Sequence, residues 1–398
     1  MHRLRNPRQA YDWGSTLDIP RFVGDEGDGS PVAEEWMGTH PLGESVVVGA
    51  DGDESTHEST LSSVAGTLPF MMKLLAAARP LSVQVHPSAA LAAEGFAADE
   101  ELGLPLDDPK RTYKDPHHKP EMVYAITRFD TLVGFRPTAE ILRVLQTLDL
   151  PLTRRLGDEL SADPGFAGIV RLVEDVLDDG VSIDEVHELV ARCRRLVDQN
   201  IDIKRAYTTV VDIAEHHPDD VGLVVSLLLN RLTLQPGEAA FLADGIIHAH
   251  LRGLCVEVMA SSDNVLRGGL TSKHVNTSEL VRCLDAGMSR LARVTPELFG
   301  HSTEVFAPDV EEFALAIAQC STGETSGTVL PDSPHRIVMC TGGEVEVVNA
   351  ADERVALRRG QSLYAGADDG RLTIHGLGEV AQAFIPDGDL RGQLVDLI

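Results

Sequence analysis

The stretch LPFMMKLLAAARPLSVQVHP, residues 68–87, contains two successive runs of residues that favour β-strands. We predict one strand over residues 69–75 and a second over residues 81–85, joined by an alanine-rich connection that ends in Arg-Pro. Because side chains alternate between the two faces of a strand, the second run has one apolar face and one polar face. The polar face carries Ser82, Gln84 and His86. The stretch therefore predicts a sheet in which one face serves something other than core packing.

Downstream of these strands, residues 137–229 have a different periodicity. Their apolar residues recur at a spacing near 3.6, which is typical of amphipathic helices, and Ser182 and Glu185 have the spacing of a capping box. Strand character returns at residues 231–234 and 239–242, on either side of a Pro-Gly turn. The pattern predicts an α-helical block inserted in a mainly β chain.

A weak internal repeat indicates that the β part contains two related units. RLTLQPG, residues 231–237, and RVALRRG, residues 354–360, agree in Arg, Leu and Gly at the same offsets. In the same alignment His248 corresponds to Arg371. We therefore predict two related β-barrel units, of which only the first carries an imidazole at the site position.

The composition limits the partners and the compartment of the protein. The chain of 398 residues has a formal net charge of −28, which argues against binding to nucleic acid or to an anionic membrane. No window of about 18 apolar residues predicts a transmembrane helix, and the N-terminal segment lacks the apolar stretch of a signal peptide. The five cysteines are scattered singly, which indicates reduced thiols in the cytoplasm.

Lysine is rare in this chain, yet it gathers near the polar motifs. There are six lysines, and four of them fall in or near those motifs: Lys73, Lys114, Lys119 and Lys273. A lysine ammonium can serve a phosphate site or a proton-transfer site. The alternative is that the position of these four lysines is a coincidence, since the chain has only six.

Three short motifs carry groups that can bind a metal ion. Gln84 and His86 share one strand face and can reach one ion, although a structural histidine is the commoner explanation. Glu121, at the end of HHKPE, is a candidate ligand or general base, and a solvated polar loop is the alternative. His248 and His250 again place two imidazoles on one strand face; the alternative is that one is buried and one exposed.

Two further groups favour a pocket for an anionic, hydroxylated substrate. Glu257 lies in an apolar strand, where an unpaired carboxylate would be costly. Arg267 is followed by two glycines that let the backbone approach a ligand, and its guanidinium can bind a phosphate or a carboxylate in a bidentate manner. An ion pair between Arg267 and Asp263 is the structural alternative.

Six motifs, in the same order along the chain, resemble those of type I mannose-6-phosphate isomerases. They are YDWGS (11–15), EWMGTHP (35–41), LPFMMK (68–73), LSVQVHP (81–87), YKDPHHKPE (113–121) and EVMASSDNVLRGGL (257–270). The resemblance is strong over residues 11–135 and 219–275 and loose elsewhere. It implies two related cupin-like β-barrel (jelly-roll) domains together with a helical domain.

The resemblance and the periodicity together give the expected domains. A catalytic cupin domain would comprise residues 1–136 and 230–290, interrupted by a helical insertion at 137–229. A C-terminal cupin-like β-domain without metal ligands would comprise residues 291–398.

The resemblance also implies the site residues. One Zn²⁺ per chain would be held by Gln84, His86, Glu121 and His248. The catalytic residues would be Arg267, Lys119, Glu257 and His118, and the sequence leaves the choice of base open among the last three. The substrate and its phosphate would contact Ser82, Lys73, Lys273, Trp13, Lys114, Asp263 and His250.

Three positions depart from the family pattern. His250 and His117 stand where the family usually has Tyr and Asn, and Ile247 replaces a common Pro. The imidazole of His250 either replaces a pocket hydroxyl or adds a metal ligand, and the sequence leaves both possibilities open.

The implied reaction is the interconversion of D-mannose 6-phosphate and D-fructose 6-phosphate through a cis-enediol, a step of carbohydrate metabolism and GDP-mannose biosynthesis. The alternatives are an isomerase of another sugar phosphate and a catalytically silent sugar-binding cupin. We expect a small-molecule sugar phosphate as partner, no nucleic acid and no membrane, in the cytoplasm. The oligomeric state is left open, with a monomer favoured.

Overall fold

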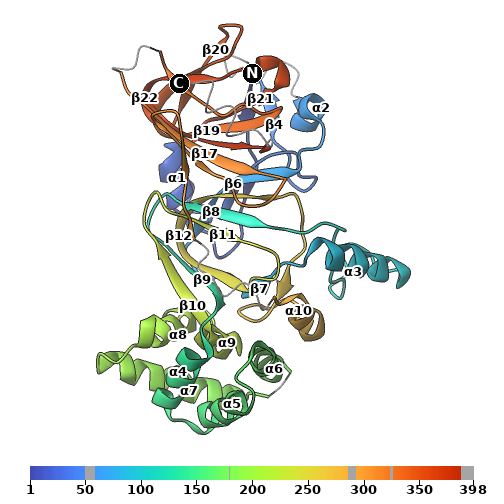
Figure 1. Cartoon of the computed structure of the whole chain (residues 1–398), viewed down its shortest axis with the longest axis vertical. Coiled ribbons are helices and arrows are strands. Elements are labelled where there is room, and N and C mark those ends of the chain that lie inside the picture. The colour runs from blue at the N-terminus through green and yellow to red at the C-terminus, as the bar shows by residue number, and fades with distance from the viewer. Residues whose placement is uncertain (50–58, 179, 286–292, 323–325, 387–398) are drawn as a thin grey trace.

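The computed structural model describes residues 1–49, 59–178, 180–285, 293–322 and 326–386. In these segments, two antiparallel sheets of eleven strands each lie one above the other, and a block of helices forms one end of the molecule (Figure 1). The predicted mainly β chain with an inserted helical block is confirmed. Within the described segments, no helix combines the length and the apolar character that a membrane span requires.

The first sheet lies between the second sheet and the helical block (Figure 1). Its strands are β2 (Arg8–Gln9), β3 (Glu34–Met37), β6 (Phe70–Ala77), β7 (Gln84–Val85), β8 (Glu121–Ala125), β9 (Phe129–Phe135), β10 (Leu229–Leu234), β11 (Ala239–Leu242), β12 (His248–Ala260), β13 (Leu266–Arg267) and β14 (Arg293–Val294).

Strand β12 passes between two sets of partners in this sheet. Its first residues pair with β7 and β9, and its residues from Gly253 onward pair with β6 and β8. The register with β9 shifts between His250 and Arg252, and Gly253 has a φ of 127°. A shift of one residue reverses the face to which the following side chains point. Consequently Glu257, although seven positions after His250, faces the same interior as that imidazole.

The second sheet contains strands from both ends of the described chain. Its strands are β1 (His2–Arg5), β4 (Val46–Val48), β5 (Ser59–Thr60), β15 (Glu297–Phe299), β16 (Thr303–Phe306), β17 (Ala314–Cys320), β18 (Thr328–Val329), β19 (His335–Val348), β20 (Arg354–Arg358), β21 (Ser362–Gly366) and β22 (Thr373–Phe384). Strand β1 lies between β21 and β4, with Arg3 opposite Leu363 on one side and Val48 on the other. Three N-terminal strands, β1, β4 and β5, therefore complete a sheet whose other strands all come after residue 296.

One apolar core joins the two sheets. Met72 and Val256 of the first sheet belong to the same buried cluster as Leu315 and Met339 of the second sheet. All four side chains are fully buried. The two sheets therefore pack face to face, which removes their apolar faces from water.

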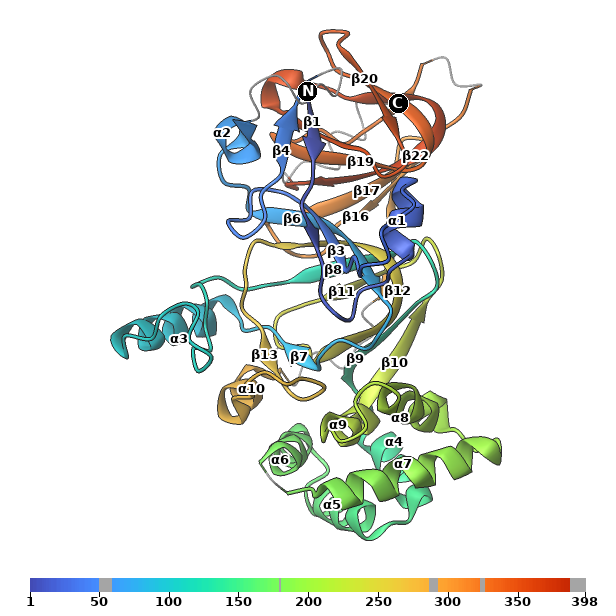
Figure 2. The same cartoon turned by 180° about the vertical axis from the view of Figure 1, so that it is seen from behind.

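The helices fall into a block and several separate elements. The block contains α4 (Thr138–Leu148), α5 (Pro151–Ala162), α6 (Phe166–Leu177), α7 (Ile183–Asp198), α8 (Ala206–Ala214) and α9 (Gly222–Leu228). The others are α1 (Asp18–Val23), α2 (Leu61–Ala65), α3 (Ala89–Glu101) and α10 (Thr277–Cys283), and α3 projects from the side of the first sheet (Figure 2). The predicted capping box is confirmed, because Ser182 N–H donates to Oε2 of Glu185 at 2.9 Å.

The two repeated segments have the same local structure. Gly237 and Gly360 both adopt positive φ, 91° and 86°, in the turn that ends each segment. Each glycine follows one strand (β10 or β20) and precedes two more (β11 and β12, or β21 and β22). The sequence repeat therefore corresponds to a repeated arrangement of three strands.

The strand predicted over residues 81–85 is shorter than expected, because only Gln84–Val85 form β7. The N–H of Leu81 donates to the carbonyl of His250 at 2.8 Å, and the N–H of Val83 donates to the carbonyl of Gly269 at 3.0 Å. The segment is thus extended, but two different neighbours hold its backbone instead of one continuous ladder.

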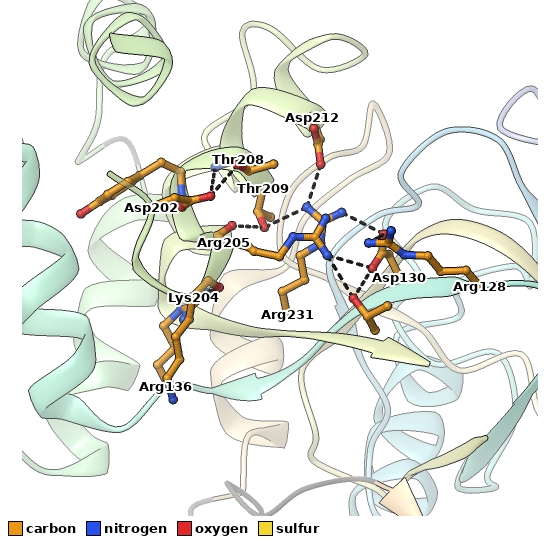
Figure 3. A network of polar contacts seen from close by, with 12 residues as sticks. Arg128, Asp130, Arg136, Asp202, Lys204, Arg205, Thr208, Thr209, Asp212 and Arg231 are labelled. Atoms are coloured by element: carbon orange, nitrogen blue, oxygen red, sulfur yellow. Dashed lines mark hydrogen bonds and ion pairs between the residues drawn. The ribbon is translucent and has the colours of Figure 1, made fainter. Parts of the chain in front are cut away.

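The helical block is attached to the first sheet through charged groups around Asp130 on β9 (Figure 3). The Asp130 carboxylate accepts hydrogen bonds from Nη2 of Arg231 at 3.0 Å, from Nη1 of Arg205 at 3.3 Å and from the hydroxyl of Thr233. Arg231 also donates to Asp212 on α8 at 2.7 Å. Although burial favours the neutral acid, the hydrogen bonds from Thr233 and Arg231 lower the pKa of Asp130. The ionised carboxylate therefore connects β9 and β10 to the segment that begins α8.

A second ionic contact joins the two sheets at His118, which precedes β8. Nδ1 of His118 lies 2.9 Å from Oδ2 of Asp244, in the loop after β11, and Nε2 lies 2.7 Å from Oε1 of Glu312, in the loop before β17. The hydrogen bond with Asp244 is the main cause that raises the pKa of His118 to about 9; burial opposes this rise and Glu312 adds to it. The imidazole is a cation at neutral pH and donates both N–H groups to carboxylates.

Replacing Asp130 with alanine removes the acceptor that four side chains share, those of Arg128, Arg205, Arg231 and Thr233. Arg231, whose side chain is 5% exposed, then loses one of its two carboxylates. We expect Asp130→Ala to lower the free energy of unfolding by about 2–4 kcal/mol, as for other disrupted buried charge networks. Urea unfolding followed by circular dichroism measures the change. Glu159→Ala, which removes an exposed partner of Arg155 on α5, is the control; equal losses in the two variants would contradict a special role for Asp130.

The raised pKa of His118 predicts a pH-dependent stability. Because the folded value, about 9, lies above the ordinary 6.5, the contact contributes fully below pH 6.5 and is lost as the pH rises through 9. We expect the free energy of unfolding to fall between these pH values, and to fall less in His118→Gln. Unfolding curves at a series of pH values measure both slopes, with His187→Gln, a change at an exposed imidazole of α7, as the control. Parallel profiles for the wild type and His118→Gln would show that the contact contributes nothing.

Candidate metal centre and adjoining pocket

Three buried side chains from three strands converge inside the first sheet. His86 follows β7, Glu121 begins β8 and His248 begins β12, and their exposed fractions are 1%, 2% and 0%. Nε2 of His86 lies 3.3 Å from Oε1 of Glu121, and Nε2 of His248 lies 3.4 Å from Oε2. The three ligand atoms all lie within 4.8 Å of one another, so one ion can contact all three.

The hydrogen bonds of the two imidazoles fix which nitrogen faces the centre. Nδ1 of His86 lies 2.7 Å from the carbonyl oxygen of Asn264, and Nδ1 of His248 lies 2.9 Å from that of Ile246. A carbonyl oxygen only accepts, so each Nδ1 carries the hydrogen and each Nε2 presents a lone pair. Both lone pairs point toward Glu121, which is also an acceptor.

The distances between these atoms fit an ion that lies among them. Charge-assisted N–H···O⁻ hydrogen bonds are about 2.7–2.9 Å long, shorter than the 3.3 and 3.4 Å seen here. Zinc bonds of about 2.0–2.2 Å give a tetrahedron with edges of about 3.4 Å. Nε2 of His86 and Oε2 of Glu121 are buried and have no hydrogen-bond partner in the described part of the chain. A buried cation is the partner that this donor set requires.

Gln84 is the fourth predicted ligand and lies beside the other three. Its Nε2 is 3.2 Å from Nε2 of His248, and the backbone of Gln84 pairs with His248 on one side and Arg267 on the other. Rotation of the amide by 180° places the oxygen at the same position. The structure therefore brings together all four predicted ligands, Gln84, His86, Glu121 and His248.

Charge and burial set the protonation of the centre. Burial alone would raise the pKa of Glu121, but His86, when it is protonated, and Lys119 hold it well below its usual range. Nζ of Lys119 lies 3.2 Å from Oε1 of Glu121. Burial lowers the pKa of His86, so its imidazole is neutral. A carboxylate and neutral imidazoles are the forms that bind metal.

A second set of buried groups shares Glu121 with the first. His250 and Glu257, both on β12, approach within 3.5 Å between Nε2 and Oε1, and their ligand atoms lie within 4.8 Å of that of Glu121. The other oxygen of Glu257 lies 3.2 Å from Nζ of Lys73, which is 3.6 Å from Glu34. Although burial favours the neutral acid, Lys73 lowers the pKa of Glu257. Lys73, predicted to contact the phosphate, therefore lies between two carboxylates.

A cavity of about 410 Å³ is lined by four cationic side chains and by the carboxylates of Asp107, Asp108 and Asp263. Lys114, Arg267 and Lys273 line it together with Arg111, and the backbone pairing of Arg267 with Gln84 connects its wall to the centre. Burial lowers the pKa of Arg267, and the charge of Arg267 lowers the pKa of Lys273. Burial and the charge of Arg111 lower the pKa of Lys114. An anion in the cavity would relieve this repulsion.

Asp263 also lines this cavity but does not neutralise Arg267. Oδ1 of Asp263 lies 3.3 Å from Nε2 of His40. In the segments that the structure covers, no carboxylate lies within ion-pair distance of Arg267. The alternative of a structural pair between Asp263 and Arg267 is therefore wrong.

Other predicted residues have different surroundings. Trp13 is partly buried, and its ring stacks on that of Tyr11, with the ring centroids 5.7 Å apart. Ser82 is partly buried in the extended segment before β7, His117 is exposed, and both ring nitrogens of His118 are bonded to Asp244 and Glu312. The structure does not bring His118 to the metal set through either nitrogen.

Asn264 is a residue whose role the sequence reasoning missed. Its amide donates to the carbonyls of Asp115 and His117, at 2.7 and 2.8 Å, and accepts from the N–H of Lys114 at 2.8 Å. Its own carbonyl accepts from Nδ1 of His86. Asn264 thus connects the loop before Glu121 to one of the histidines. The signal was its place in the motif EVMASSDNVLRGGL, directly after Asp263 and before the apolar Val265 and Leu266.

Comparisons with known proteins agree with this arrangement. Residues 1–138 match the family described as phosphomannose isomerase type I, catalytic domain. The mannose-6-phosphate isomerase of Escherichia coli K12 is 33% identical, with 96% of this chain and 99% of that protein covered. The human mannose-6-phosphate isomerase is 28% identical, with 91% and 92% covered.

A solved structure shows the same fold. The mannose 6-phosphate isomerase from Salmonella typhimurium, bound to its substrate and to zinc, is 30% identical, with a TM-score of 0.85 and with 97% of this chain and all of that chain covered. The family resemblance seen in the six motifs is confirmed. The chain belongs to the type I mannose-6-phosphate isomerase family.

Proposed function

We propose that the protein is a zinc-dependent enzyme that interconverts D-mannose 6-phosphate and D-fructose 6-phosphate. The observation that carries this proposal is the buried set of His86, Glu121 and His248, with unpartnered ligand atoms, beside a cation-lined cavity. The set offers ligand atoms for a metal ion, and the cavity offers cationic side chains for a phosphate. Family membership supplies the reaction.

Gln84, His86, Glu121 and His248 would hold one Zn²⁺. When bound, zinc supplies a Lewis acid that polarises the carbonyl and hydroxyl oxygens of the sugar and stabilises the negative charge that develops on them. The carbonyls of Asn264 and Ile246 keep the two imidazoles oriented with Nε2 toward the ion.

Arg267, Lys273 and Lys114 would bind the phosphate of the substrate. They line one cavity, the charges of Arg267 and Lys114 lower the pKa of Lys273, and Arg267 offers a planar fork that suits two phosphate oxygens. Ser82, which precedes β7, would add a hydroxyl, and Trp13 and Asp263 would border the sugar. In a chain with a net charge of −28, this local excess of cations provides the attraction for an anionic substrate.

The reaction moves a proton between C2 and C1 of the open-chain sugar through a cis-enediol. Lys119 and Glu257 are the candidate bases, since both are buried and each lies next to the metal set. Arg267 would stabilise charge on the sugar oxygens or assist ring opening. His118 is the weaker candidate, because its two ring nitrogens are bonded to Asp244 and Glu312.

We also propose the arrangement of domains and the cellular context. Two cupin-type barrels would be built on residues 1–136 with 230–290 and on residues 291–398, with the helical insertion at 137–229. The repeated three-strand unit supports this division, while β1, β4 and β5 cross from the first part to the sheet of the second.

All five cysteines are buried and free, which supports the cytoplasm as the compartment.

Removal of metal tests the proposed function directly. We expect protein stripped with a chelator to lose formation of fructose 6-phosphate from mannose 6-phosphate, and Zn²⁺ to restore it. A coupled assay measures the product. The control is mannose without the phosphate, which should react much more slowly because the cationic cavity contributes nothing. A folded, zinc-loaded protein without activity would reject the isomerase and favour a silent sugar-binding cupin.

Substitution of Lys119 tests whether this residue takes part in proton transfer or in metal binding. We expect Lys119→Ala to lower kcat by about 10²-fold or more, the usual contribution of a general acid or base, while the zinc content per chain stays that of the wild type. Steady-state kinetics and metal analysis measure the two effects. Lys110→Ala, at an exposed lysine before the same motif, is the control. If turnover survives in Lys119→Ala, this lysine only binds or positions the substrate.

A further inference from the structure

The imidazole of His250 is buried, and its Nε2 atom has no hydrogen-bond partner among the residues that the structure places. Nδ1 lies 3.1 Å from the hydroxyl of Thr131, which also lies 3.1 Å from the carbonyl of Ala249. The hydroxyl has one hydrogen, which the carbonyl can only accept, so the hydroxyl oxygen accepts from Nδ1–H. In its neutral form, His250 therefore presents a bare lone pair at Nε2.

This lone pair faces two carboxylates. Oε1 of Glu257 is 3.5 Å from Nε2 of His250, and an oxygen of Glu121 completes a group whose ligand atoms lie within 4.8 Å of one another. A separation of 3.5 Å is too long for a charge-assisted hydrogen bond but matches the edge of a metal coordination shell, about 3.4 Å for zinc. The same pattern of bare imidazole, carboxylate and long separation occurs at His86 and His248.

We propose that the centre binds a second divalent cation through Glu121, His250 and Glu257, so that the Glu121 carboxylate bridges two ions. The inference rests on the proposed function for the first ion, held by His86, His248 and the same carboxylate. An imidazole with two carboxylates suits Zn²⁺ or Mn²⁺. Three protein ligands leave positions open for water or substrate oxygens.

The neighbouring lysines make the second position weaker than the first. Lys73 is 3.2 Å from Oε2 of Glu257, and Lys119 is 3.2 Å from Oε1 of Glu121. These ammonium groups already neutralise part of the carboxylate charge, so the second cation gains less Coulombic energy. It also has one imidazole where the first has two. The two ions are therefore released in order, the second before the first.

The second ion changes the choice of base. With Oε1 of Glu257 on the cation and Oε2 on Lys73, neither oxygen is free to take a proton from C2 of the sugar. Lys119 is then the base that remains next to the metal set. His250 would in this way fix the role of Glu257.

Metal stoichiometry tests the proposal. Chelator-stripped protein is dialysed to equilibrium against a series of Zn²⁺ concentrations, and the bound metal per chain is measured by mass spectrometry. We expect the wild type to saturate at two ions in two steps, and His250→Gln and His250→Tyr to saturate at one. His187→Gln, which changes a surface imidazole paired with Asp219, is the control and should keep two.

Two outcomes would overturn the proposal: a wild type that saturates at one ion, or His250 variants that still bind two. Circular dichroism shows whether a variant is folded. If a variant is not folded, the number of metal ions bound per wild-type chain still decides whether the second site exists. A second readout is the electron paramagnetic resonance of Mn²⁺-loaded protein, where two ions on one carboxylate give a coupled signal and a single ion gives six isolated lines. Both readouts are independent of turnover. Protein that binds two ions without isomerising the sugar would reject the proposed function alone.

Discussion

The site depends on one buried carboxylate, that of Glu121. An ionised carboxylate that is 2% exposed must be neutralised by neighbours, because desolvation otherwise costs more than the fold can supply. Lys119 contacts one of its oxygens, and the imidazoles of His86 and His248 lie on either side with their lone pairs inward. A cation among these groups would complete the neutralisation of the buried carboxylate.

Strand β12 shows how the backbone delivers these groups. It contributes one end to the pairing with β7 and β9 and the other to the pairing with β6 and β8, and the register shift after His250 brings Glu257 to the same interior. Without that shift, the seven-residue spacing would send Glu257 to the opposite face. The irregularity is thus part of the site: it lets a single strand supply both the first group of ligands and the second.

The sequence predicted the residues of the site better than the contacts that hold them in place. Gln84, His86, Glu121 and His248 could be found because alternation along strands and six ordered motifs point to them. The helical block followed from the 3.6-residue periodicity of residues 137–229. The sequence could not predict three sets of contacts. They are those of His118 with Asp244 and Glu312, of Lys73 with Glu34, and of His86 with Asn264. Each joins residues far apart in the chain, and only the packing of the two sheets sets their distance.

The position of β1 has a consequence for the folding of the chain. Arg3 pairs with Leu363, which is synthesised 360 residues later. At about 5–20 residues per second, a ribosome needs about 20–70 s to supply that partner. Until then one edge of β1 remains an unpaired strand that other chains can pair with. The second sheet closes only after nearly all of the chain has been made, and such non-local pairing makes this sheet the slow, aggregation-sensitive stage of folding.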